Sequence, residues 1–162
     1  MTRMERIQRI LNHQLFQSHL WCNTEAEIGG GFCGHDLEHS LDVARIAYIR
    51  NLESSLGFDK EIIYAAALLH DLTKWKQDLD GVPHHTSAIE PAKQILEECQ
   101  FDSGEIDMIT RAILNHRAEP EDETGFDALL YRADKLSRNC FSCKAAGQCN
   151  WSPEKKNQTV TY

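Results

Sequence analysis

Apolar residues recur at three- and four-residue spacing along most of this chain, and that periodicity restricts its fold more than any other feature. Residues 7–15 mark a first amphipathic helix, and Ile106, Ile109 and Ile113 form one face of a later helix. No segment alternates apolar and polar residues as a half-buried strand does. The pattern therefore predicts an all-α fold.

Glycine, proline and short polar segments divide this pattern into five or six main helices in a compact bundle. The expected helices cover residues 7–15, 37–56, 60–72, 89–99, 103–113 and 122–138. Loops are expected at residues 27–34, which contain three consecutive glycines, and at residues 77–85, which contain an Asp-Gly turn and a proline.

The 162 residues suggest one domain. We expect a helical domain at residues 1–138, followed at residues 139–162 by a cysteine-containing loop and a polar C-terminal tail, packed on or trailing that domain. The formal net charge of −8 disfavours binding to a nucleic-acid backbone. No apolar stretch is long enough to span a membrane, and no secretory signal is apparent, so a cytoplasmic protein is expected.

Histidines and aspartates interrupt the apolar faces. The apolar run at residues 62–69 ends in the adjacent pair His70-Asp71, whose burial needs compensation. His39 and His116 lie on or beside apolar stripes of two other predicted helices, and Asp134 continues the stripe of a fourth. A single buried histidine is commonly a hydrogen-bonded core residue, but carboxylates are rarely buried without a partner. Imidazoles and carboxylates that converge from four helices have the composition of a divalent-metal site.

Three motifs occur in order on these predicted helices. They are HDLEHSLDVARIA at residues 35–47, LLHDLTK at residues 68–74 and RADKL at residues 132–136. Together they resemble the HD-domain metal-dependent phosphohydrolase superfamily, whose pattern is a histidine, a His-Asp pair and a distant aspartate. The resemblance implies that the metal ligands are His39, His70, Asp71 and Asp134.

Many members of that superfamily have further histidines that hold a second metal. The segments VPHHTSA at residues 82–88 and ILNHR at residues 113–117 fall where such histidines are expected. His116 fits this role, and His85 is favoured over His84 because it lies at the mouth of a predicted helix. Without a second metal, one of these histidines could act as general acid. Capping of that helix or contact with solvent is the simpler interpretation of the loop histidines.

The resemblance also implies a chemistry. A metal bound by these ligands would leave positions for water and a phosphoryl oxygen, and would lower the pKa of the water. The expected activity is hydrolysis of a nucleotide or of another small phosphate ester or anhydride. The expected cofactor is one or two divalent ions, Mn, Fe, Co, Ni or Zn, with Mg also compatible. Lys74 resembles a lysine that can face the substrate phosphate, and Arg117 is a further candidate. Arg138 is expected on the surface.

Two other interpretations remain open at this stage. The chain could be a non-catalytic module of the same fold that senses a nucleotide or a metal, although all four core ligands are present. It could also be a helical protein whose histidines are only core residues. The expected partner is a small phosphorylated molecule, with no membrane and no nucleic acid. The sequence does not indicate an oligomeric state.

Three cysteines near the C-terminus form a separate pattern. Cys140, Cys143 and Cys149 have C-x2-C-x5-C spacing, which resembles the last three cysteines of the cluster loop in endonuclease III-like glycosylases. That loop has another cysteine seven positions upstream, where this chain has Ala133. Cys33 is the first candidate for a fourth ligand and Cys22 is the second. A structural zinc, an iron–sulfur cluster and free thiols are the alternatives.

Overall fold

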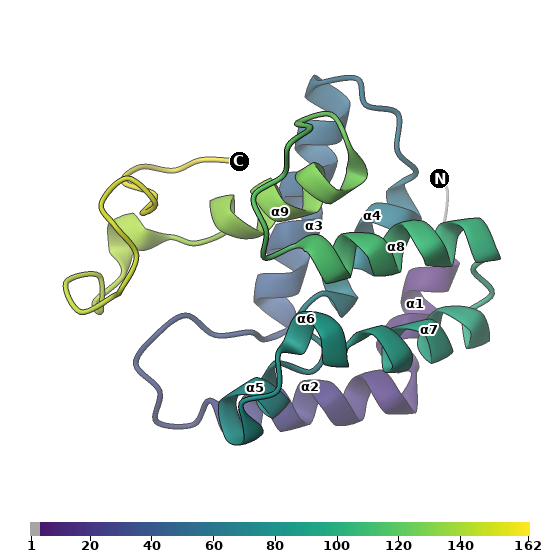
Figure 1. Ribbon diagram of the computed structural model, residues 1–162, viewed down its shortest axis with the longest axis horizontal. Coiled ribbons are helices and arrows are strands. Elements are labelled where there is room, and N and C mark those ends of the chain that lie inside the picture. The colour runs from purple at the N-terminus through teal and green to yellow at the C-terminus, as the bar shows by residue number, and fades with distance from the viewer. Residues whose placement is uncertain (1–3) are drawn as a thin grey trace.

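The computed structural model describes residues 4–162, which fold into α-helices joined by short loops, without a β-strand (Figure 1). The helices are α1 (Glu5–Asn12), α2 (Gln14–Ala26), α3 (Leu37–Glu53), α4 (Lys60–Leu69), α5 (Lys74–Asp80), α6 (His84–Ser87), α7 (Ile89–Glu98), α8 (Ser103–Asn115) and α9 (Phe126–Leu136), followed by the 3₁₀ turn η1 (Cys140–Ser142). The predicted all-α fold is confirmed.

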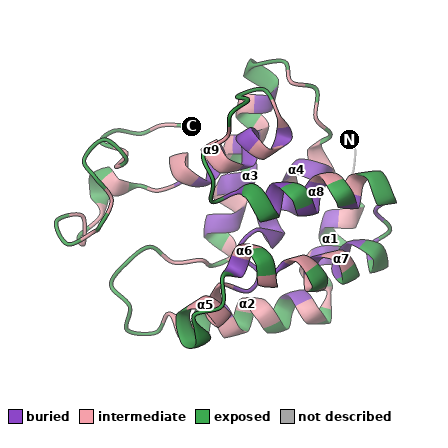
Figure 2. Ribbon diagram, in the orientation of Figure 1, coloured by how far each residue is buried: buried purple, intermediate pink, exposed green. Residues whose placement is uncertain are grey.

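Helix α4 lies at the centre of the bundle, where it packs against α1, α3, α8 and α9 (Figure 1). Its sequence is almost entirely apolar, and seven of its ten residues are buried (Figure 2). Asp59 begins the helix by accepting hydrogen bonds from the backbone N–H groups of Glu61 and Ile62. A helix that is apolar on all sides is stable only when neighbours cover it on several faces. This position brings its C-terminal end, with His70 and Asp71, into the interior.

Three parts of the fold differ from the sequence-based expectation. Helix α2 continues to Ala26, although no helix was expected over residues 16–26. The first predicted helix is divided at His13, whose extended backbone ends α1 and whose side chain accepts a hydrogen bond from Leu15 N–H to begin α2. The predicted loop at residues 77–85 is partly helical, because α5 continues to Asp80 and α6 begins at His84. Gly81 ends α5 with a positive φ of 70°, so the turn itself was placed correctly.

Residues 137–162 contain no α-helix and lie beside the loop between α2 and α3 (Figure 1). Asn157 Nδ2 donates to the carbonyl oxygens of Lys135 and Arg138, and Arg138 Nη1 donates to Gly34 O at 2.7 Å. The C-terminal segment is therefore tied both to the end of α9 and to the loop that precedes α3. Among the helices of residues 4–162, none has the length and apolar character that crossing a membrane requires.

Candidate metal centre

Four buried side chains from three parts of the bundle meet at one point. His39 comes from α3, Asp134 comes from α9, and His70 and Asp71 directly follow α4. One ligand atom from each of these residues lies within 4.8 Å of the others. His70 Nε2 lies 2.9 Å from Asp71 Oδ2, and His39 Nε2 lies 3.3 Å from Asp134 Oδ1. The structure thus brings together the four residues of the sequence motif.

The donor set fits a divalent metal. Although the carboxylates are close, neither His39 Nε2 nor His70 Nε2 makes a hydrogen bond within residues 4–162, and both nitrogens are buried. Buried polar atoms in proteins almost always have a partner, and an imidazole nitrogen without one needs an explanation. Two such nitrogens beside two carboxylates are suitable ligands for a first-row transition metal.

A second group lies on the other side of Asp71. Asp71 Oδ1 is 3.0 Å from His84 Nε2 and 3.6 Å from His116 Nε2, and the two histidine nitrogens are 3.1 Å apart. One ligand atom from each of these three buried residues again lies within 4.8 Å of the others. Asp71 therefore belongs to both groups, with one carboxylate oxygen directed to each. This is the arrangement of a carboxylate that could bridge two metal ions.

Hydrogen bonds fix the orientation of three of the imidazoles. His70 Nδ1–H donates to Ala67 O at 2.7 Å, and His116 Nδ1–H donates to Ile113 O at 2.6 Å. A carbonyl oxygen can only accept, so in a neutral ring the lone pair must be on Nε2. His84 Nδ1 contacts Gln77 Oε1 at 2.7 Å, and that same oxygen accepts from the His84 backbone N–H. All three rings consequently direct Nε2 toward Asp71, as metal-binding histidines do.

The charges of the centre support one another. Burial alone would raise the pKa of Asp71, but the positive charge of His70 and the neighbouring imidazoles of His116 and His39 hold it well below the ordinary value. Asp134 has a similarly lowered pKa, because His39 and His70 outweigh its burial. Burial disfavours a charged His70, yet Asp71 and Asp134 raise its pKa to about 10. Burial lowers the pKa of His84. Ionised carboxylates in this interior attract a cation.

The structure corrects the preference for His85 over His84. His84 is buried and faces Asp71 and His116, whereas His85 is only half-buried and its Nδ1 has no hydrogen-bond partner. The reason is the short helix α6, which begins at His84 and follows Pro83 directly. Consecutive residues on a helix point in different directions, so only one histidine of the pair faces the centre.

A cavity of about 150 Å³ opens onto this centre, and several cationic side chains line it. Lys74 is half-buried and forms an ion pair with Asp78, and Arg117 donates to Gln77 Oε1 at 3.1 Å. Arg138, expected on the surface, is half-buried and also lines the cavity. The cavity is thus lined both by carboxylates and imidazoles of the centre and by cationic side chains.

Sequence reasoning missed the residues that support the centre. Asn23 from α2 is buried, and its side chain bonds the backbone of Asp71 at 3.0 Å and of Trp75 at 2.8 Å. Lys135 Nζ pairs with Asp134 Oδ2 at 2.6 Å, and Ser137 Oγ lies 3.3 Å from His39 Nδ1. An asparagine inside an apolar stretch of α2 was the one visible signal, since buried polar side chains need partners.

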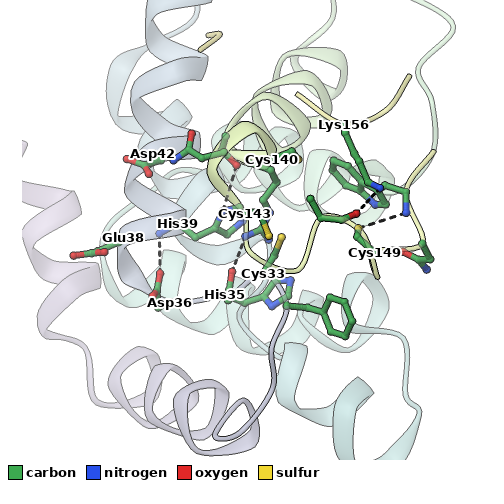
Figure 3. A pocket seen from close by; sticks show the side chains of 18 of the residues that line it. Cys33, His35, Asp36, Glu38, His39, Asp42, Cys140, Cys143, Cys149 and Lys156 are labelled. Atoms are coloured by element: carbon green, nitrogen blue, oxygen red, sulfur yellow. Dashed lines mark hydrogen bonds between the residues drawn. The ribbon is translucent and has the colours of Figure 1, made fainter. Parts of the chain in front are cut away.

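The predicted cysteine ligands line a neighbouring cavity. Cys33, Cys140, Cys143 and Cys149 all border this space, whose volume is about 640 Å³ (Figure 3). His35, Lys74, Arg138 and Trp151 line both cavities, so the two spaces adjoin. Cys22, the second candidate, lies on α2 and does not line this cavity.

Comparisons with known proteins agree with this geometry. The sequence profile of the HD domain matches residues 36–139, which is more than half of the chain. A protein of uncharacterised function from Clostridium beijerinckii is 47% identical over 159 residues, covering 98% of this chain and all of the relative. The crystal structure of a predicted HD superfamily hydrolase from an uncultured Thermotogales bacterium matches with a TM-score of 0.62 and 25% identity, covering 86% of this chain and 79% of that one. This chain, with its buried His and Asp residues, belongs to the HD-domain family of metal-dependent hydrolases.

Proposed function

We propose that the protein hydrolyses a small phosphate ester or anhydride, with a nucleotide as the substrate. The observation that carries this proposal is the position of Asp71, whose buried carboxylate belongs to both histidine-containing groups. The adjoining cavity, with Lys74 and Arg117 on its wall, has the charge that a phosphate requires. A phosphoryl group could therefore lie between the carboxylates of the centre and these cations.

Residues His39, His70, Asp71 and Asp134 would hold a first divalent ion, and Asp71, His84 and His116 a second. When bound, such ions supply Lewis acidity and a water of lowered pKa. The chain itself orients the imidazoles through the Ala67, Ile113 and Gln77 oxygens. The lowered pKa of His84, caused by its burial, keeps this ring neutral and suits it to ligation rather than to proton donation.

Lys74 and Arg117 are placed to bind substrate oxygens. Both line the 150 Å³ cavity, and developing negative charge on a transferring phosphoryl group is stabilised by fixed cations. The half-buried Trp151 lines the same cavity and offers an aromatic surface for a nucleobase. This position is the feature that supports a nucleotide over an aliphatic phosphate ester.

Phosphate release tests the proposal. The purified full chain would be loaded separately with Mn²⁺, Fe²⁺, Co²⁺, Ni²⁺, Zn²⁺ and Mg²⁺. Each form would be assayed with nucleoside monophosphates, cyclic nucleotides, dinucleoside polyphosphates and aliphatic phosphate esters. We expect hydrolysis of at least one nucleotide class and a loss of more than about 100-fold in Asp71→Asn, since supporting ligands alone are worth up to that factor.

A matched control is Asp107→Asn, because Asp107 is exposed on α8 and belongs neither to the metal centre nor to the lining of its cavity within residues 4–162. This variant should retain full activity. If the protein binds metal but releases phosphate from none of these compounds, the non-catalytic sensing interpretation is correct and the proposed activity is wrong. If nucleotides and aliphatic esters are hydrolysed equally well, and Trp151→Ala changes neither rate, the nucleotide assignment is wrong. The proposed phosphate hydrolysis would still hold.

A further inference from the structure

Four cysteines that are far apart in the sequence meet at one cavity outside the metal centre. Cys33 belongs to the loop between α2 and α3. Cys140 begins the turn η1, Cys143 directly follows it, and Cys149 lies six residues after Cys143. All four are free thiols that line the 640 Å³ cavity. The side chains of Cys33 and Cys143 point toward one another (Figure 3). The hydrolytic mechanism uses none of these residues.

The structure supplies the cysteine that the sequence pattern lacks. The C-x2-C-x5-C spacing of the last three cysteines would require a fourth seven positions upstream, but that residue is Ala133, fully buried in α9. Cys33 instead lines the same cavity from the loop between α2 and α3. Next to Cys33, Arg138 Nη1 donates to Gly34 O at 2.7 Å, and this hydrogen bond joins the C-terminal segment to the loop between α2 and α3.

The local backbone suits metal-bound thiolates. Cys143 N–H donates to Cys140 O at 3.2 Å, which forms a tight turn between the two cysteines of the C-x2-C pair. Trp151 N–H points at Cys149 Sγ, 3.5 Å away, as backbone N–H groups do where they stabilise a ligating sulfur. Lys156 Nζ donates to Ala146 O at 2.7 Å and closes the loop that contains Cys149.

We propose that Cys33, Cys140, Cys143 and Cys149 hold an iron–sulfur cluster of the four-cysteine type. A single zinc ion would place the ligand sulfurs about 3.8 Å apart, given Zn–S bonds of about 2.3 Å in a tetrahedron. Among the described residues, no three of these sulfurs lie within 4.8 Å of one another. In a [4Fe–4S] cluster, which is the form that we propose, each thiolate binds a different iron, so its ligands stand further apart than those of a single zinc ion.

The cluster would join the C-terminal segment to the loop between α2 and α3. Both segments carry residues that also line the cavity of the metal centre, His35 from the loop and Trp151 from the C-terminal segment. The cluster therefore fixes one wall of the substrate entrance. It is a structural element in this proposal, and no electron transfer is assigned to it.

Acid-labile sulfide tests the proposal without reference to hydrolysis. The full chain would be produced and purified without oxygen, reconstituted with iron and sulfide, and analysed for iron, zinc, sulfide and visible absorption. We expect about four sulfides per chain and a brown chromophore. Cys140→Ser and Cys33→Ser should each reduce the sulfide content at least several-fold. Cys22→Ser should leave it unchanged, because Cys22 does not line the cavity.

Sulfide also separates the cluster from iron bound at the histidines. Asp71→Ala should lose metal from the HD centre and keep its sulfide. The experiment can therefore disprove the iron–sulfur cluster without disproving the hydrolytic metal centre, and the reverse. Wild-type protein that contains zinc but no sulfide after reconstitution would overturn the cluster, whether or not the cysteine variants fold. Full sulfide content in a helical, folded Cys33→Ser protein would overturn the four-cysteine site.

Discussion

At the scale of single residues, the adjacency of His70 and Asp71 is explained by their place just beyond α4. His70 is still helical and its Nδ1–H bonds the carbonyl of Ala67, while Asp71 lies in the following turn. The change in backbone direction lets two consecutive side chains face the same point, which they would not do within a helix. Asn23 then holds the turn by accepting from Trp75 N–H and donating to Asp71 O.

We expect Asn23→Ala to weaken both folding and metal binding. The substitution leaves buried backbone groups without partners, which costs about 1–3 kcal/mol of unfolding free energy. It also frees the turn that orients Asp71, so metal affinity should fall. Urea denaturation and metal titration of the same sample measure the two effects.

Asn51→Ala is the matched control for this experiment. Asn51 is also buried, and it bonds both Phe58 N–H and Phe58 O in the connection between α3 and α4, away from the centre. It should lose a similar amount of stability but keep its metal affinity. Equal affinity losses in the two variants would show that Asn23 acts only through general stability.

At the scale of elements, most of the long helices were predictable and the short ones were not. The 13-residue α2 was missed, because only Phe16 and Asn23 of its residues are buried and it has no apolar stripe. Helices α3, α4 and α8 begin at their expected positions, because apolar periodicity and the capping residues Asp36, Asp59 and Asp102 mark them. Helix α9 has no side-chain cap and begins four residues later than expected. Helices α5 and α6 contain seven and four residues, too few to form alone in water. They depend on tertiary contacts, such as the hydrogen bond from Trp75 Nε1 to His19 Nδ1 at 3.0 Å.

The choice between His84 and His85 depended on α6, so it could not be made from the sequence. Gln77 on α5 contacts the Nδ1 atom of His84 and thereby orients this ring toward Asp71. Removing the Gln77 side chain should therefore weaken metal binding by His84. Gln77→Ala should lower metal affinity at the second group about 10–100-fold, because His84 loses the acceptor for its Nδ1–H. Metal analysis should then find a reduced second equivalent with the first retained.

Gln77→Glu keeps an acceptor oxygen and should retain the second metal. Gln94→Ala is a further control, because Gln94 lies on α7 and its side chain bonds only Glu98. An unchanged metal content in Gln77→Ala would mean that His84 is oriented by other contacts, such as that of its carbonyl with Thr73 Oγ1.

The loop between α2 and α3 should respond to acid through Glu27. Its carboxylate accepts from His35 N–H at 2.9 Å and contacts His35 Nδ1 at 2.5 Å. Partial burial would raise the pKa of Glu27, but these hydrogen bonds outweigh it and hold the pKa below its ordinary value of 4.5. A lowered pKa in the folded state stabilises the protein above about pH 4.5, and this contribution is lost as the pH falls through the folded-state value.

We therefore expect wild type to be more stable than Glu27→Gln at pH 7 and pH 5, with the difference shrinking below pH 4.5. Urea unfolding of both proteins at several pH values measures the difference, and the comparison cancels the titration of the metal ligands, which the two proteins share. A difference that stays constant down to the lowest pH would rule out a role for the charge of Glu27.

At the scale of the whole molecule, the all-α fold and the converging histidines and aspartates could be predicted from the sequence. The residues that orient those side chains could not. His39, His70, Asp71, Asp134 and His116 lie on long helices or at their ends, where periodicity identifies inward-facing positions. The supporting contacts of Asn23, Gln77 and Ser137 join elements that are distant in sequence or too short to predict. Their partners are determined by tertiary packing, which no local pattern encodes.

Metal removal should show how far the fold depends on this centre. Asp71 and Asp134 are buried and ionised in a chain of net charge −8, so the folded protein offers a cation a negatively charged site that the unfolded chain does not assemble. A ligand that binds only the folded state stabilises it by RT ln(1 + [L]/Kd). The unfolding free energy should therefore rise with each tenfold increase in free metal above Kd, by about 1.4 kcal/mol for each ion bound.

The slope of this dependence counts the ions. Thermal unfolding in buffers of fixed free Mn²⁺ should give about 2.8 kcal/mol per decade if both groups bind, and about 1.4 kcal/mol if only one does. For a chain of this length each kcal/mol corresponds to about 2–4 °C in Tm, which is readily measured. Asp71→Ala removes the residue common to both groups and should give no slope, and any slope that it retains belongs to metal bound elsewhere. A wild-type slope of zero would mean that the converging histidines and aspartates are a hydrogen-bonded core and hold no ion.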